Sequence, residues 1–238
     1  MHLFTIIVLF LSIISSSSYS ATFSDNFAST NISVWNYDPY TSIDNGRLKI
    51  QLPNSVTWSG AHSLGKMYIY GDFEYQVDYN SASMSSNNGW HVLMRAQTDD
   101  NKIVEIKRAY YGSNVYDGSY YNGSTWQSWN PISTSDTSGK LKIRRSGTNF
   151  YIYYWDSVDS RWEYNNNTNG YLVSSAIGTA PVFFFLATGT QTNTFTATSY
   201  FDNFSVSADG ISPELSSYFL LFLGITCLYS LKNRKNKS

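Results

Sequence analysis

The chain has 238 residues, of which 17% are aromatic and only 14% carry a charge, and its formal net charge is −1. Between the two ends, residues 21–210 hold 12 Lys/Arg and 16 Asp/Glu, a net charge of −4. This balance argues against a nucleic-acid partner, because phosphate binding needs a basic face. The body is long enough for a single domain with one sizeable core.

The first 20 residues have the pattern of an export signal. Residues 5–14 are nearly all apolar, and Ser18 and Ser20 precede Ala21 in the small-x-small arrangement that signal peptidase accepts. We therefore predict that residues 1–20 are a removed signal peptide. The alternative is an uncleaved N-terminal anchor, although the apolar run is shorter than the ~20 residues that a membrane span needs.

The body consists of short alternating apolar and polar runs bounded by Gly, Asn, Ser and Asp, and no stretch has a sustained helical stripe. Hairpin turns are expected at 44–46, 99–101 and 146–147. This pattern predicts an all-β fold, a two-sheet antiparallel sandwich or jelly roll. The expected strands are 23–27, 47–52, 72–79, 90–97, 102–108, 115–121, 140–145, 149–155, 182–187 and 200–207.

Alternation within the strands 72–79, 90–97 and 102–108 separates apolar from polar side chains. We expect the polar positions to share one face of one sheet, and a curved sheet would turn that face into a groove. These positions are Glu74, Gln76, Asp78, His91, Arg95, Gln97, Glu105 and Lys107.

Several motifs along the body resemble a known fold family. They include Phe23-Ser-Asp-Asn-Phe27, Gly89-Trp-His-Val-Leu-Met-Arg95, Tyr151-Ile-Tyr-Tyr-Trp155 and Phe201-Asp-Asn-Phe204. Together they are similar to a concanavalin A-like lectin/glucanase domain of the laminin G-like sort, over residues 22–207. The resemblance implies two sheets packed face to face, neighbouring first and last strands, and a concave face that binds or cleaves carbohydrate.

Two tryptophans stand out as candidate ligand-binding residues. Trp126 and Trp129 lie in a stretch rich in Gly, Ser, Asn and Tyr, and flat rings suit the C–H faces of sugars. With His91, Arg95 and Glu105 of the polar face, they form the predicted carbohydrate-binding set. The alternative is that the two rings only pack on strand surfaces.

Two aspartates near the ends of the body are candidate metal ligands. If the first and last strands pair, Asp25 and Asp202 point to the same side, and two like charges there need a partner. A Ca²⁺ ion would supply it, so we predict a possible calcium site. Alternatively, each aspartate accepts hydrogen bonds from loop N–H groups or meets an arginine.

Glycoside hydrolysis is a second possible function. It needs two carboxyl groups about 5 to 9.5 Å apart, and Glu74, Asp78 and Glu105 are the candidates on the polar face. The Glu-x-Asp-x-x-Glu arrangement of related glucanases is absent. Arg95 and Lys107 could instead hold these carboxylates in structural ion pairs.

The C-terminal end has three parts, namely the polar segment 211–217, the apolar segment 218–231 and the basic tail 232–238. This order predicts a membrane anchor helix with the tail in the cytoplasm and the body outside. Pro213-Glu214, the apolar helix and the basic end resemble a PEP-CTERM sorting signal, which implies a sorting transpeptidase. Leu215 replaces the expected proline, so a plain anchor stays open, as does a buried core helix.

The single cysteine lies in the apolar segment, so the body has no disulfide bond.

Taken together, the sequence features predict an exported protein of the cell envelope or cell surface, tethered to the membrane. We expect it to serve as a carbohydrate-binding or cell-surface interaction module rather than as an enzyme. The alternatives are a glycoside hydrolase that acts on polysaccharide through concave-face carboxylates and a structural surface or matrix protein without a small ligand.

Overall fold

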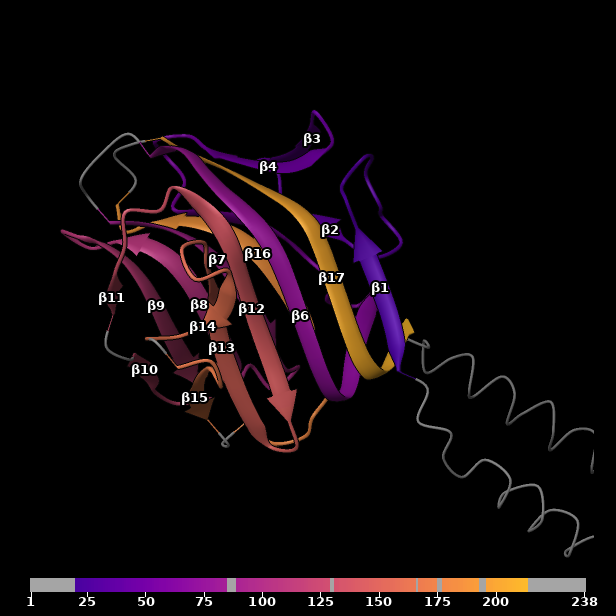
Figure 1. Ribbon diagram of the computed structural model, residues 1–238. Helices are drawn as coiled ribbons and strands as arrows, with labels where there is room; N and C mark the ends of the chain where they lie inside the picture. The colour runs from indigo at the N-terminus through magenta and orange to yellow at the C-terminus, as the bar shows by residue number, and fades with distance from the viewer. Residues whose placement is uncertain are drawn as a thin grey trace, which may run out of the picture.

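The computed structural model describes residues 20–84, 89–128, 131–165, 167–174, 177–192 and 196–213. Every regular element in these ranges is a β-strand, and the strands form two antiparallel sheets (Figure 1). The same ranges contain no helix that is long and apolar enough to cross a membrane. Residues 1–19 of the predicted signal, and the predicted anchor 218–231 with its basic tail, lie outside the described residues.

Nine of the described strands form the first sheet. They are β1 (Ala21–Asp25), β3 (Thr41–Asp44), β4 (Arg47–Leu52), β6 (Met67–Met84), β12 (Ser138–Ser146), β13 (Asn149–Asp156), β14 (Arg161–Glu163), β15 (Tyr171–Ser174) and β17 (Ala197–Pro213). Their order is β14-β13-β12-β6-β17-β4-β3, with β1 paired to β17 and β15 to β13. The first and last strands are therefore neighbours.

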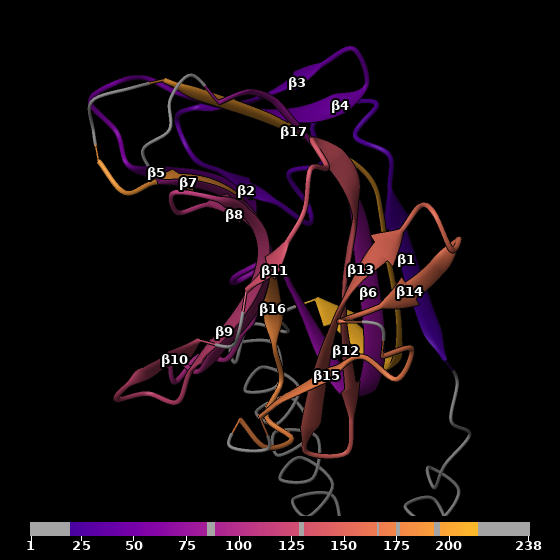
Figure 2. The ribbon, with the colours of Figure 1, turned by 60° about the vertical axis from the view of Figure 1, so that its left-hand side comes forward.

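Eight described strands form the second sheet. They are β2 (Asn36–Tyr37), β5 (Trp58–His62), β7 (Trp90–Gln97), β8 (Ile103–Tyr110), β9 (Asn114–Tyr121), β10 (Trp126–Ser128), β11 (Ile132–Ser133) and β16 (Phe183–Thr190). Their order is β10-β9-β8-β7-β16-β5-β2, and β11 pairs with β9. Figure 2 shows this sheet bent, with its hollow side turned away from the nine-stranded sheet. We call that side the concave face.

Aromatic side chains join the two sheets. The Trp35 ring lies 5.0 Å from the Phe204 ring of β17 and 5.5 Å from the Phe184 ring of β16, centroid to centroid. Tyr75 of β6 packs on the same two phenylalanines. All four side chains are almost completely buried, and such ring pairs add to the free energy gained from burial alone.

The predicted all-β, two-sheet antiparallel sandwich is confirmed. Each of the ten expected ranges overlaps a strand, and the bounds 47–52 and 90–97 agree with β4 and β7. The strands that the sequence pattern missed are two to five residues long, too short to show an alternation. The last strand runs on to Pro213, so residues 211–213 of the predicted linker pair with β6.

Replacing Trp35 with alanine tests the inter-sheet packing. Because Trp35 is 1% exposed and its Nε1–H also donates to Asp25 at 3.0 Å, we expect Trp35→Ala to lower the free energy of unfolding by about 3–5 kcal/mol. Urea denaturation measures this change. Val158→Ala, at a side chain 89% exposed, is the control and should stay within about 0.5 kcal/mol of the parent. A loss below about 1 kcal/mol for Trp35→Ala would contradict the packing described.

Candidate active site

The candidate site lies on the concave face, where β7, β8 and β9 run side by side. In their register Arg95 lies opposite Glu105, Glu105 lies opposite Ser119, and Lys107 lies opposite Asp117. Side chains alternate along a strand, so these five point to the concave face while the residues between them point to the core. The pairing thus gathers two basic and two acidic side chains on three neighbouring strands.

Glu105 is the centre of this charged group. Its side chain is 5% exposed, and one oxygen, Oε2, accepts hydrogen bonds from Arg95 Nε at 3.1 Å and Nη2 at 2.8 Å. The other oxygen, Oε1, accepts from Ser119 Oγ at 2.6 Å and from Lys107 Nζ at 3.1 Å. A buried carboxylate is tolerated only with such partners, and these contacts hold Glu105 in one orientation.

Lys107 joins the two carboxyl groups. Its Nζ lies 3.1 Å from Glu105 Oε1 and 3.2 Å from Asp117 Oδ2, and it also donates to Ser119 Oγ at 3.1 Å. The two carboxylate oxygens are therefore at most 6.3 Å apart, the sum of their distances to the shared nitrogen. The second oxygen of Asp117, Oδ1, is enclosed and has no hydrogen-bond partner in the described part of the chain.

The pKa values of the two carboxyl groups are shifted in opposite directions. Burial acts to raise the pKa of Glu105, but Lys107, Arg95 and the Ser119 hydrogen bond outweigh it and hold that pKa at about 2. Burial raises the pKa of Asp117, and Glu105 adds to the rise while Lys107 opposes it. In such a pair one carboxylate stays ionised while the other more readily holds a proton.

His91 of β7 lies on the same face. Its ring centroid is 5.8 Å from that of Trp58, and it rests on Gly189 of β16, where an added Cβ would come within 2.2 Å of the His91 Nε2. Burial, with the nearby Lys107 charge, lowers the pKa of His91 to about 4. The imidazole is therefore neutral at neutral pH.

Two tryptophans border the charged group. The Arg95 guanidinium carbon lies 4.9 Å from the centroid of the Trp58 ring and 6.0 Å from that of Trp126. Trp126, on the edge strand β10, is 51% exposed and packs against the Tyr121 ring at 5.3 Å. These rings present flat apolar surfaces beside charged and hydroxyl groups, a combination that suits sugars.

The concave face holds an open cleft of about 420 Å³. This volume lies within the range of about 300–1,000 Å³ that small-molecule sites have. Its lining residues come from β5, β7, β8, β9, β10 and β16 and from Thr57, which precedes β5. They are Thr57, Trp58, His91, Leu93, Arg95, Glu105, Lys107, Ser119, Trp126, Ser128 and Thr190.

Four of the five residues predicted to bind carbohydrate line this one cleft, namely His91, Arg95, Glu105 and Trp126. The fifth, Trp129, lies outside the described residues. Carbohydrate binding by these residues stays a prediction. The ion pairs that the sequence suggested as an alternative are present, since Arg95 and Lys107 both contact Glu105.

Sequence reasoning did not select Trp58 or Asp117 as site residues. Trp58 begins a strand of only five residues, Trp58–His62, in which small residues hide the alternation. Asp117 lies within the expected strand 115–121, where nothing in the local sequence indicates its partner. Only the pairing of β9 with β8 brings it to Lys107.

The prediction that Glu74 and Asp78 share a face with Glu105 was wrong. Both belong to β6 of the nine-stranded sheet, whereas Glu105 belongs to β8 of the other sheet. On β6 they form ion pairs with Lys142 and Lys140 of β12, at 2.8 and 3.1 Å. Alternation assigns a side chain to a face of its own strand, but it does not say which sheet that strand joins.

The two predicted calcium ligands already have hydrogen-bond donors. Asp25 accepts from the Phe27 backbone N–H at 2.7 Å and from Trp35 Nε1 at 3.0 Å, and Asp202 accepts from the Asn203 backbone N–H at 2.7 Å. These contacts are of the kind that the sequence offered as the alternative to a metal. Calcium at these positions stays a prediction.

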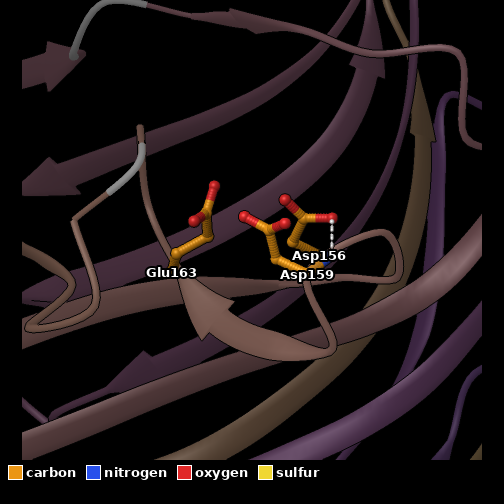
Figure 3. Close-up of side chains that lie close together, drawn as sticks. All are labelled: Asp156, Asp159 and Glu163. Atoms are coloured by element: carbon orange, nitrogen blue, oxygen red, sulfur yellow. Dashed lines mark hydrogen bonds between the residues drawn. The ribbon is translucent and has the colours of Figure 1, made fainter.

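Three other acidic residues, Asp156, Asp159 and Glu163, lie close together near the turn between β13 and β14 (Figure 3). One ligand atom from each lies within 4.8 Å of the others, and no second such group of three is found among the described residues. Arg161 Nη2 neutralises two of them, at 2.9 Å from Asp159 and 2.8 Å from Glu163. Asp156 instead accepts from the Val158 backbone N–H at 2.7 Å.

The sequence matches no protein-family model and no curated protein. Solved structures share its fold. Apo Crh5 transglycosylase has a TM-score of 0.60 at 12% identity, with 79% of this chain and 85% of that chain covered. A prokaryotic β-1,3-1,4-glucanase (lichenase) derived from a mouse hindgut metagenome has a TM-score of 0.57 at 10% identity, over 80% and 100%. The Bacillus licheniformis β-glucanase has a TM-score of 0.54 at 12% identity, over 79% and 98%.

These similarities correct the prediction that the chain is a carbohydrate-binding or cell-surface interaction module. The similar structures are named for enzymes that cleave or transfer glycans, so they favour the alternative of a glycoside hydrolase. At 10–12% identity the likeness establishes the fold alone. A proposal about its activity must therefore be argued from the side chains of this chain.

The pKa of Glu105 gives a pH-dependent stability. The folded pKa is about 2, against an ordinary 4.5, so the unfolded state binds more protons between these pH values. The stabilisation is complete above pH 4.5, amounts to about 3 kcal/mol, and is lost as pH falls to 2. We expect Glu105→Gln to remove this part of the decrease, measured by urea denaturation across pH.

Glu74→Gln is the matched control for that experiment, because the Glu74 side chain is 45% exposed and lies on the other sheet. It should keep the acid-dependent decrease of the parent. Identical pH profiles for Glu105→Gln and the parent would contradict the ion-pair assignment.

Proposed function

We propose that the protein is a glycoside hydrolase that cleaves polysaccharide in the cleft of the concave face. The observation that carries this proposal is the pair Glu105 and Asp117, with oppositely shifted pKa values and oxygens at most 6.3 Å apart. Retaining glycosidases have carboxyl groups about 5–5.5 Å apart, and inverting enzymes about 6.5–9.5 Å. The upper bound of 6.3 Å lies below the inverting range, so we propose the retaining mechanism.

In this mechanism Glu105 is the nucleophile and Asp117 is the general acid. A Glu105 oxygen attacks the anomeric carbon, and a covalent glycosyl–enzyme ester forms while Asp117 gives its proton to the departing glycosidic oxygen. Asp117 then takes a proton from a water molecule, whose oxygen attacks the same carbon and releases Glu105. The net reaction consumes one water for each glycosidic bond broken.

Arg95 and Lys107 prepare the two carboxyl groups for these roles. Arg95 donates twice to one Glu105 oxygen, which keeps the carboxylate ionised and oriented. Lys107 contacts both carboxyl groups, so its charge balances Asp117 after the proton has left. Two residues after Glu105, the strand β8 carries Lys107 and not a second carboxylate. The general acid in this mechanism, Asp117, therefore comes from the neighbouring strand β9, where it lies opposite Lys107.

The lining of the cleft favours a polysaccharide substrate. Trp126, half exposed at the edge of the sheet, and Trp58, on the opposite side of Arg95, offer rings on which sugar units can stack. The glucanase-type structural neighbours are named for the same substrate class. Polysaccharide is therefore the substrate that we propose.

Substitution of each carboxyl group tests the mechanism. We expect Glu105→Gln to lower kcat/KM at least about 10³-fold and Asp117→Asn to lower it about 10²–10⁴-fold. Release of reducing ends from soluble β-1,3-1,4-glucan, β-1,3-glucan, xylan and chitin oligosaccharides measures the rate. Glu74→Gln and Asp78→Asn, on the other sheet, should leave it unchanged. Full activity in Glu105→Gln, or none in the parent on any of these substrates, would overturn the proposal.

We also propose that the chain is exported and tethered in the cell envelope with the sandwich outside. Support comes from the small-x-small pattern before Ala21 and from the apolar segment 218–231 followed by four basic residues. An extracytoplasmic location would place the cleft where polysaccharides are found. A sorting transpeptidase would act near Pro213-Glu214.

Mass spectrometry of the envelope-associated protein tests this location. If the segment is a sorting signal, we expect the mature chain to lack residues 1–20 and 218–238. If the mature chain keeps residues 218–238, the segment is an uncleaved membrane anchor and not a sorting signal. Recovery of the full-length chain in the cytoplasmic fraction would contradict export.

A further inference from the structure

His91 and Trp58 both line one part of the cleft. The neighbouring positions on β5 and β16 are small, with Gly60 opposite Ala187 and Gly189 opposite Trp58 in the register. The His91 ring lies directly over the Gly189 backbone. Trp58 forms the adjacent wall, with its ring 5.8 Å from His91.

His91 has a ring nitrogen without a partner. Its Nδ1 is enclosed and accepts or donates no hydrogen bond among the described residues. A buried polar atom without a partner costs about 1–3 kcal/mol, so a native protein normally supplies one. The χ2 angle of histidine has two broad minima that differ by a half-turn of the ring. A half-turn exchanges the positions of Nδ1 and Cδ2, so either edge of the His91 ring can present a nitrogen atom.

The two cationic side chains nearest to His91, Lys107 and Arg95, do not supply that partner. The three N–H bonds of Lys107 are matched by Glu105, Asp117 and Ser119, and Arg95 donates to Glu105 through Nε and Nη2. The charged residues that line the cleft, Arg95, Glu105 and Lys107, are paired with one another, and Lys107 also pairs with Asp117. A neutral hydroxyl group in the cleft is therefore the partner that fits His91, because a charged group would meet no unpaired counter-charge there.

We propose that His91 is a specificity-determining residue that hydrogen-bonds a hydroxyl group of the sugar unit seated against Trp58. This proposal rests on the proposed function, since it names a contact within the same cleft. The cleft of about 420 Å³, which His91 and Trp58 both line, provides room for the ring of that sugar. His91 then selects a sugar with a hydroxyl group at that position over one that lacks it.

Binding without turnover separates this contact from catalysis. In the Glu105→Gln background, calorimetry measures the affinity for β-1,3-1,4-glucan, β-1,3-glucan, xylan and chitin oligosaccharides. We expect His91→Phe to weaken binding of the best of these about 10-fold, as the loss of one hydrogen bond does. His91→Asn places an amide near the former Nδ1 and should recover most of the loss.

His62→Phe is the matched control. His62 also has an enclosed Nδ1 without a partner among the described residues, but it does not line the cleft, so affinity should stay within about twofold. Thermal unfolding should show no loss of stability in His91→Phe, since the substitution removes an unpaired polar atom. If Glu105→Gln does not fold, Asp117→Asn serves as the background.

The outcomes distinguish the two proposals. Unchanged affinity in His91→Phe, or an equal loss in His62→Phe, overturns the role of His91 and leaves hydrolysis standing. Binding that depends on His91 in a parent that cleaves nothing overturns hydrolysis alone. Absence of binding to every oligosaccharide overturns both.

Discussion

The structure depends on the aromatic packing between its two sheets. Trp35, Phe184 and Phe204 lie within 5.5 Å of one another, centroid to centroid, and they come from a loop, from the curved sheet and from the nine-stranded sheet. Phe184 is followed on β16 by Phe185, which points to the other face and lies 5.8 Å from the Arg95 guanidinium. The strand β16 therefore contributes both to the core and to the cleft, and the same aromatic packing fixes its position in both.

On the concave face, the burial of charged side chains decides which groups can carry a proton. Removing the charges of Glu105, Lys107 and Asp117 from water is unfavourable. The fold tolerates these buried charges because the Lys107 ammonium group lies within hydrogen-bond distance of both carboxylates. The unequal surroundings push the two carboxyl pKa values apart, since Glu105 has two cations and a hydroxyl donor while Asp117 has one cation and an unpaired oxygen. One pair of strands thus provides an ionised carboxylate and a more readily protonated one.

The errors of the sequence-based interpretation have the same origin. Glu74 and Asp78 have the alternation of a polar face, as Glu105 does, but β6 and β8 belong to different sheets. The sequence pattern offered the carboxylates of the strand 72–79 as partners for Glu105, whereas Asp117 lies across the β8–β9 pairing. The absence of the Glu-x-Asp-x-x-Glu arrangement also argued against an enzyme.

By itself, the sequence determined the all-β class, most of the long strands, and which side chains share a face within the strands 72–79, 90–97 and 102–108. These are local properties, because an alternation of period two and a Gly- or Asn-containing turn act over a few residues. It also brought forward His91, Arg95, Glu105 and Trp126, which the fold places in one cleft. The tertiary structure alone decided which strands are neighbours, and hence that Lys107 meets Asp117, that Trp58 borders Arg95, and that Glu74 lies on the other sheet. Those pairings depend on contacts between residues far apart in the chain, and no local pattern specifies them.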